Sequence, residues 1–303
     1  MDAHRGPKTI LLTGATGYVG GRLLPELLDA GHTVRCLVRD PGRRRGQLPG
    51  AAEVVGGDVV TGEGLDEALA GADVAFYLVH SMESGAGGDF AERDRRAART
   101  FGDAVRRAGV ARTVYLGGLE DDAGGQSEHL RSRHEVAELL AERVPCLVHV
   151  RAAMVVGAGS ASFVMLRSLV ERLPAMVCPR WVDTPSQPVS IVDVVRTLAE
   201  LADRDEVPRE VQLGGADVLT YREMMERYAR VAGRRAPAIV KVPLLSPRLS
   251  SYWVGLVTPV ESALARPLVE GLGAEMVVRE PPPEGINDAP LGFDEAVRVA
   301  LRG

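Results

Sequence analysis

The sequence predicts an α/β protein with a doubly wound parallel sheet and a smaller C-terminal lobe. In the first half of the 303 residues, short and continuously apolar runs alternate with longer amphipathic segments. Continuously apolar strands are typical of parallel sheets, because helices cover both of their faces. A glycine-rich turn joins the first strand to the first helix, as is usual in such sheets. Beyond residue 153 this alternation stops, which indicates the separate lobe.

The elements of the first half follow from the spacing of apolar residues. Short, mainly apolar runs predict strands at 8–13, 33–38, 52–55, 73–79, 112–116 and 146–151. Apolar residues that recur every three to four positions predict helices at 18–30, 63–70, 90–108 and 127–143. Pro25 lies inside the first of these helices, so we expect a local kink there.

The second half contains fewer regular runs. Helices are predicted at 160–172, 191–202, 220–232 and 293–302, with short strands at 211–213 and 239–242. Thr220 followed by Glu223 has the spacing of a capping box at the start of the third of these helices. The proline-rich residues 174–188 are expected to be irregular, and 279–290 an exposed loop.

Composition excludes several classes of function. A net charge of −5 gives no reason to expect a nucleic-acid partner. The three cysteines are far apart and lack Cys-x-x-Cys spacing, so we expect neither disulfides nor a metal site, and a reducing, cytoplasmic location. The polar first eight residues predict no secretory leader, and no apolar run is long enough to predict a transmembrane helix.

The sharpest motif is the turn between the first strand and the first helix. Gly14, Gly17 and Gly20 form Gly-x-x-Gly-x-x-Gly. Glycines there allow a tight turn, let the backbone approach a pyrophosphate and let the helix pack on the strand, while the helix N-terminus offers free N–H groups to phosphate. This context predicts a Rossmann-type dinucleotide site rather than a purely structural turn. The loop residues expected to touch the cofactor are Gly14, Thr16, Gly17, Tyr18, Val19 and Gly20.

The end of the second strand indicates which dinucleotide binds. A carboxylate at this place would bind the 2′-hydroxyl of NAD, whereas Arg39 is the first polar side chain here and suits the 2′-phosphate of NADP(H). Asp40 follows and either caps the next turn or binds ribose, and Arg43 or Arg44 would add charge. Asp58, after the third strand, either accepts a hydrogen bond from adenine or forms a turn through its own side chain.

These residues resemble the short-chain dehydrogenase/reductase superfamily. The glycine loop together with Cys36-Leu-Val-Arg-Asp-Pro is similar to its atypical and extended branches, which include NmrA-like NAD(P)H-binding proteins. The resemblance covers roughly residues 8–160. It implies about seven parallel strands, an NADP-binding Rossmann domain over residues 1–157 to which the segment near 187–215 returns, and a mainly substrate-binding lobe over 158–303.

The catalytic Tyr-x-x-x-Lys pattern and upstream Ser of that family are altered. Ser132-Arg133 resembles the family's Ser-Lys pair, which puts Arg133 at the lysine position and His129 at the tyrosine position. Gly117 and Gly118 stand where the serine is expected. A histidine transfers protons near neutral pH, and arginine holds ribose hydroxyls without deprotonating. His129 is therefore our candidate proton donor, with a helix-surface residue as the alternative.

A second candidate follows the fourth strand, where the backbone of this fold passes along the cofactor. Val79 and His80 are expected to touch the cofactor there, and His80 is a second candidate acid, with a loop residue contacting only ribose as the alternative. Tyr77, two residues earlier, is expected in the core. Arg151-Ala-Ala-Met-Val-Val-Gly resembles the family's Arg-Pro-x-x-Val-x-Gly segment beside the nicotinamide, with Ala152 replacing proline.

These interpretations predict an NADPH-dependent oxidoreductase that reduces a carbonyl, quinone or enone compound. Trp181, Trp253 and the apolar run 252–260 lie in the second half and either pack in the core, line an apolar substrate pocket or form a surface patch. The altered catalytic positions leave two alternatives: a catalytically silent NADP(H)-binding sensor or scaffold, and a non-redox isomerase or dehydratase. The expected partner is a small apolar molecule, and the expected assembly is a monomer or homodimer.

Overall fold

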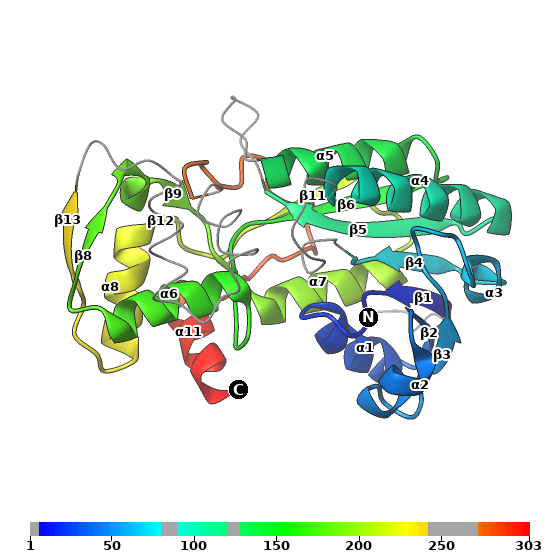
Figure 1. Ribbon diagram of the computed structural model, residues 1–303, viewed down its shortest axis with the longest axis horizontal. Coiled ribbons are helices and arrows are strands. Elements are labelled where there is room, and N and C mark those ends of the chain that lie inside the picture. Colours follow the sequence, from blue (N-terminus) through cyan, green and yellow to red (C-terminus); the bar gives the residue numbers. More distant parts are fainter. Residues whose placement is uncertain (1–5, 80–89, 120–127, 242–271) are drawn as a thin grey trace.

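A seven-stranded parallel sheet organises the first two thirds of the chain. The computed structural model describes residues 6–79, 90–119, 128–241 and 272–303, with the backbone alone at 128–130 and 180. The strand order is β11-β6-β5-β4-β1-β2-β3, and every pairing between neighbours is parallel (Figure 1). This order confirms the predicted doubly wound Rossmann fold. The strands are β1 (Thr9–Thr13), β2 (Thr33–Val38), β3 (Glu53–Gly56), β4 (Val74–Tyr77), β5 (Arg112–Gly118), β6 (Leu147–Ala152) and β11 (Glu210–Leu213).

Helices cover both faces of this sheet, as a parallel sheet requires. In Figure 1, α4 and α5 lie above the sheet, and α1 and α7 lie below it. Leu23, Leu24 and Leu27 turn the apolar side of α1 into the core beneath the strands, and α1 continues through Pro25. The helices are α1 (Gly20–Asp29), α2 (Pro41–Arg44), α3 (Leu65–Leu69), α4 (Phe90–Ala108), α5 (Glu128–Ala141) and α7 (Ile191–Asp203), with a 3-10 helix η1 (Arg45–Gln47).

The C-terminal lobe has a hydrophobic core of its own. Phe163, Met224, Tyr228 and Phe293 are buried together there, contributed by three different helices. Three two-stranded pairs complete the lobe and its junction with the main sheet: β10 with β7, β12 with β9, and β13 with β8. The elements are β7 (Val155–Val156), α6 (Ala161–Arg172), β8 (Ala175–Cys178), η3 (Arg180–Asp183), β9 (Pro185–Ser186), β10 (Val189–Ser190), β12 (Leu219–Thr220), α8 (Tyr221–Val231), β13 (Ala238–Lys241) and α11 (Phe293–Arg302).

The prediction of an irregular segment at 174–188 was wrong. This stretch contains β8, η3 and β9, and each of the two strands pairs with a segment far along the chain. Proline is tolerated here because Pro185 lies in a two-residue edge strand, where few ladder hydrogen bonds are needed. The run 252–260, with Trp253, lies outside the described residues.

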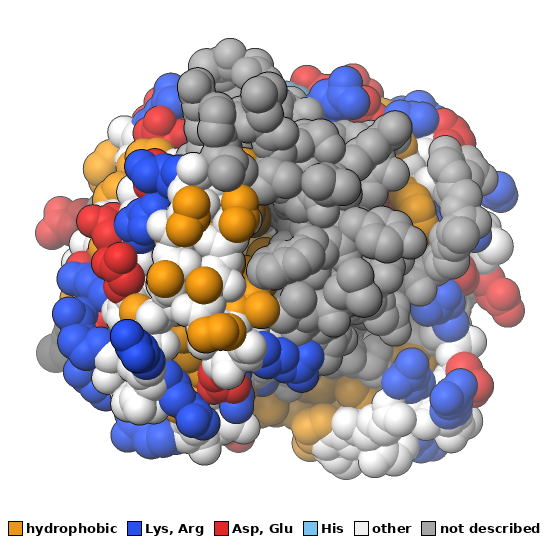
Figure 2. Space-filling view, turned by 60° about the vertical axis from the view of Figure 1, so that its left-hand side comes forward, with side chains coloured by type: hydrophobic (Ala, Val, Ile, Leu, Met, Phe, Trp, Pro, Cys, Tyr) orange, Lys and Arg blue, Asp and Glu red, His pale blue; other side chains and the backbone are white. Residues whose placement is uncertain are grey.

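The surface of the lobe is partly apolar. Val177 and Val240 pair across the β8–β13 ribbon and are 52% and 57% exposed. Figure 2 shows hydrophobic side chains gathered on this end of the molecule, which is turned forward in that view. Within the described ranges, no helix has both the length and the hydropathy that a membrane span requires.

Candidate functional site

A single long cleft connects the carboxyl ends of the parallel strands with the C-terminal lobe. It has a volume of about 1130 Å³. Ligands bind doubly wound sheets at this edge, where the strand order reverses between β1 and β4. All the predicted cofactor-contacting residues that the structure describes line this cleft: Gly14, Thr16, Gly17, Tyr18, Val19, Gly20, Arg39, Asp58, Val79 and Arg133.

The glycine loop is shaped as a bare backbone cradle. Gly14 has a φ of +73°, and a Cβ atom there would lie 2.6 Å from the Leu78 carbonyl oxygen. A Cβ atom at Gly20 would lie 2.2 Å from the Gly14 carbonyl oxygen, so α1 reaches the end of β1 only without a side chain at this position. The residues at the start of α1 line the cleft, where the free N–H groups of a helix N-terminus suit a pyrophosphate. This cradle fits a dinucleotide.

Thr13 fixes the cradle to the neighbouring strand. Its hydroxyl donates to the Phe76 carbonyl oxygen at 2.9 Å and accepts from the Leu78 N–H at 3.1 Å. Tyr18 lies on the other side of the loop, with the Arg22 guanidinium 4.1 Å above its ring. Arg22 also donates to the Ala158 carbonyl oxygen at 2.8 Å, which connects the loop to the segment between β7 and α6.

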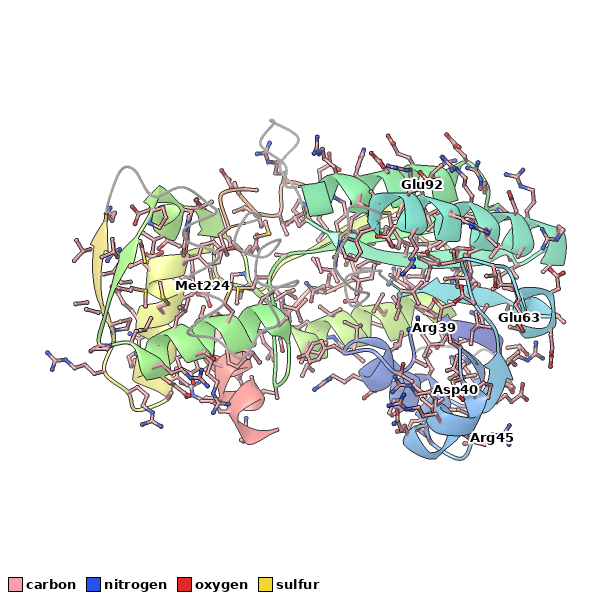
Figure 3. All side chains as sticks on the ribbon, in the orientation of Figure 1. Arg39, Asp40, Arg45, Glu63, Glu92 and Met224 are labelled. Carbon is pink, nitrogen blue, oxygen red and sulfur yellow. The ribbon has the colours of Figure 1, made fainter. Side chains whose placement is uncertain are left out.

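Arginines dominate the nucleotide end of the cleft. Arg39 is exposed at the end of β2 and lies nearer the middle of the molecule than Arg45, which lies beside α2 at the rim (Figure 3). Asp40 caps α2 by accepting from the Arg43 N–H at 3.1 Å, so the structure shows the capping role among the two we considered. The described residues that line the cleft include more arginines than aspartates. The five arginines are Arg39, Arg43, Arg44, Arg93 and Arg133, and the three aspartates are Asp40, Asp58 and Asp94.

Asp58 forms the turn that follows β3. Its Oδ1 atom accepts from the Val60 N–H at 2.6 Å and from the Thr61 N–H at 3.4 Å. The turn-forming role that we considered is therefore present in the structure. Asp58 still lines the cleft, so the turn and a hydrogen bond to a nucleotide do not exclude each other.

Of the altered catalytic positions, one lines the cleft and a neighbouring residue points toward helix α4. Arg133 lines the cleft, and its carbonyl oxygen accepts from the Tyr115 hydroxyl at 3.2 Å, which ties α5 to β5. Ser132 is 8% exposed and lies toward α4, with its hydroxyl 3.5 Å from an Asp94 carboxylate oxygen. The backbone of His129 belongs to the first turn of α5, while its side chain and the whole of His80 lie outside the described residues.

A partly buried histidine lies beside the glycine at the position where a serine was expected. His149 lies on β6 opposite Tyr115 of β5, and their rings stack at 5.2 Å. A Cβ atom at Gly117 would lie 2.6 Å from the His149 Nε2 atom. Burial lowers the pKa of His149 to about 4, so its ring is neutral near pH 7. Sequence reasoning missed His149, because nothing in the apolar run of β6 distinguishes it.

The far end of the cleft is apolar and is formed by the C-terminal lobe. Trp181 from η3 and Tyr221 from α8 line it, and their rings meet edge to face with centroids 5.9 Å apart. Trp181 was considered as a pocket residue from the sequence. Tyr221 was not, since its place beside the capping box indicated only a helix start. The other apolar residues at this end are Met165, Leu166, Leu169, Met225, Leu272 and Met276.

Comparison with protein families shows to which family the chain belongs. The family described as NAD(P)H-binding matches residues 14–167, just over half of the sequence. The chain belongs to this NAD(P)H-binding family. The match confirms the NAD(P)H-binding site that the glycine loop indicated. Within the part of the chain that the structure describes, no group of three or more His, Cys, Asp and Glu residues is placed to hold a metal ion.

Several relatives of this NAD(P)H-binding protein are reductases by name. Ceramide reductase of Caulobacter vibrioides is 26% identical over 238 residues, 77% of this chain and 73% of the relative. Dihydroflavonol 4-reductase of Hordeum vulgare is 37% identical over 91 residues, but these are only 27% of this chain and 25% of the relative. An NADPH-dependent quinone oxidoreductase of Escherichia coli, solved with NADPH, has a TM-score of 0.76 at 18% identity over 95% of this chain and 98% of that chain.

Proposed function

We propose that the protein is an NADPH-dependent reductase of a small apolar carbonyl, quinone or enone compound. The observation that carries this proposal is the continuity of one cleft, which begins at the glycine loop and Arg39 and ends among apolar side chains of the lobe. A dinucleotide laid along the strand ends would place its nicotinamide between these two ends. The substrate would then reach the nicotinamide from the lobe.

Residues at the nucleotide end would hold the cofactor through arginine side chains and backbone N–H groups. The loop from Gly14 to Gly20 would bind the pyrophosphate, Arg39 the 2′-phosphate, and Arg133 the ribose hydroxyls. When bound, NADPH would supply a hydride, that is, two electrons and one proton. The substrate carbonyl also takes up one proton and becomes a hydroxyl group, and we propose His129 or His80 as the source of that proton.

The relatives support the same chemistry without fixing the substrate. Two of those described above are reductases by name, and a protein of the same fold is a quinone oxidoreductase by its title. An apolar substrate also agrees with the lining of the lobe end, where thioether and aliphatic side chains predominate.

The choice of cofactor is tested by Arg39→Ala. We expect the wild-type protein to bind NADPH more tightly than NADH in a fluorescence titration. Loss of a charge-assisted contact to the 2′-phosphate should weaken NADPH binding by about 10- to 100-fold and leave NADH unaffected. Arg45→Ala is the matched control, because Arg45 lies on the same segment but does not line the cleft. Equal affinity for the two cofactors, unaltered in Arg39→Ala, would contradict the 2′-phosphate assignment.

Catalysis is tested with a panel of quinones, enones and ketones, by following NADPH oxidation at 340 nm. We expect turnover with at least one apolar member of the panel. His129→Phe and His80→Phe, made separately, should identify the proton donor by a fall in kcat with little change in the KM for NADPH. Turnover that is unchanged in both variants would remove both assignments. NADPH binding without oxidation by any member would favour the sensor instead, which the altered Tyr, Lys and Ser positions motivate.

A further inference from the structure

Two hydrogen-bond donors lie unpaired at the lobe end of the cleft. The indole Nε1 of Trp181 and the hydroxyl of Tyr221 are both shielded from solvent, and no described residue pairs with either of them. Tyr221 as a whole is only 5% exposed. Both side chains line the cleft.

Unpaired donors are not a general property of the buried aromatic residues of the lobe. The hydroxyl of Tyr228, two turns further along α8, donates to a Glu171 carboxylate oxygen at 2.6 Å. Buried polar groups in folded proteins are nearly always paired, so an unpaired group on a cleft wall needs an explanation, and a ligand in the cleft is one. Trp181 and Tyr221 line the cleft, whereas Tyr228 does not.

The residues around the two donors offer few hydrogen-bond acceptors. Met165, Met225 and Met276 also line the cleft, and thioether sulfur is a weak acceptor. The buried Ser186 hydroxyl approaches Tyr221 and offsets part of the rise that burial causes in the Tyr221 pKa. The two hydroxyls do not meet hydrogen-bond geometry, so both remain unpaired among the described residues.

We propose that Trp181 and Tyr221 bind a hydrogen-bond acceptor at the end of the substrate remote from the nicotinamide, and that the substrate is an apolar cyclic dicarbonyl of the quinone type. This inference rests on the proposed function, because it takes the cofactor to fill the other end of the cleft. One carbonyl would then lie at the strand ends to receive the hydride. The second, across an apolar ring, would meet the two donors.

The test measures binding under conditions in which no hydride can be transferred. The protein is saturated with NADP⁺ and titrated calorimetrically with menadione, a quinone with two opposed carbonyls, and with 1-tetralone, which has one. We expect Tyr221→Phe to weaken menadione binding by about three- to tenfold, since it removes one neutral hydrogen bond and keeps the ring. Trp181→Phe should weaken it by at least as much, because it removes the N–H donor together with part of the indole. Binding of 1-tetralone should change less than twofold in Tyr221→Phe, and its change in Trp181→Phe measures the lost ring contact.

The matched control is Tyr228→Phe, the same substitution on the same helix but outside the cleft. It should leave menadione binding unchanged, and all three variants should bind NADPH as the wild type does, which shows that they are folded. Menadione affinity that is unchanged in Trp181→Phe and Tyr221→Phe would overturn the inference, as would a wild-type protein that binds no menadione. Weakened binding together with no NADPH oxidation by any quinone would instead overturn the proposed function and leave the donor pair in place.

Discussion

At the scale of single residues, His149 shows how a core position shapes the candidate site. Its ring fills the space behind Gly117, so the strand end keeps a glycine where relatives of this fold class are expected to carry a serine. The cost of a serine would be a contact of 2.6 Å between its Cβ atom and the His149 Nε2 atom. The altered catalytic position and the partly buried histidine are therefore in direct contact.

His149 should also make the stability of the protein depend on pH. Its pKa is about 4 in the folded state and about 6.5 when unfolded, so between these values the unfolded chain binds the extra proton. Its contribution is complete above about pH 6.5 and is lost as the pH falls toward 4. The full shift corresponds to about 3 kcal/mol. Urea unfolding at pH 7.0 and pH 4.5 measures this difference.

His149→Phe is the control for that measurement, because it keeps the stack on Tyr115 and cannot be protonated. Carboxyl groups elsewhere contribute to acid unfolding in both proteins, so the quantity of interest is the difference between them. We expect the variant to lose less stability than the wild type between the two pH values. Equal losses would show that His149 does not titrate in this range.

At the scale of elements, α8 depends on the capping box that the sequence predicted. The Thr220 hydroxyl accepts from the Glu223 N–H at 3.2 Å, and a Glu223 carboxylate oxygen accepts from the Thr220 N–H at 2.7 Å. Tyr221 is the first residue of the helix, so this cap also fixes where its ring enters the cleft. A loss of the cap should therefore affect both stability and the lobe end of the cleft.

We expect Thr220→Ala to lower the free energy of unfolding by about 1 kcal/mol, the usual effect of removing an N-cap hydroxyl. Chemical denaturation with urea measures it. Thr220→Ser keeps the accepting oxygen and should stay within about 0.5 kcal/mol of the wild type. A Thr220→Ala protein as stable as the wild type would show that the helix start is held by packing alone.

The elements also show which parts of the fold a sequence can predict. The helix at 90–108 and the strand at 33–38 were predicted to the residue, because each has a strong and unbroken period. β8 and β9 were missed, because short strands depend on partners such as β13 and β12 that lie far along the chain. Local spacing carries no information about such pairings.

In the candidate site, too, residues set by local sequence were predicted and residues set by tertiary packing were not. The glycine loop and Arg39 were predicted because backbone geometry and charge at a strand end impose particular residues there. Tyr221 could not be predicted, because its position in the cleft results from the packing of α8 against η3, a tertiary contact. The calorimetric comparison of Tyr221→Phe with Tyr228→Phe is thus a test of something that only the structure suggests.

At the scale of the whole molecule, the two halves are interleaved along the chain. After β6 the chain enters the lobe through β7 and α6, returns to the sheet in α7 and β11, and then leaves again for α8. β11 pairs with β6 at the edge of the main sheet, and α7 packs against α1 beneath it. The walls of the lobe end of the cleft therefore come from segments on both sides of this return.

This interleaving limits how substrate range can change by recombination. A single crossover after β6 would exchange α7 and β11 together with the lobe, and so would replace one edge of the nucleotide-binding sheet as well. Exchange of the lobe alone needs two separate grafts, one before α7 and one after β11. Point substitutions at the cleft wall, at positions such as Trp181 and Tyr221, offer a simpler route by which a lineage of such proteins can acquire new substrates.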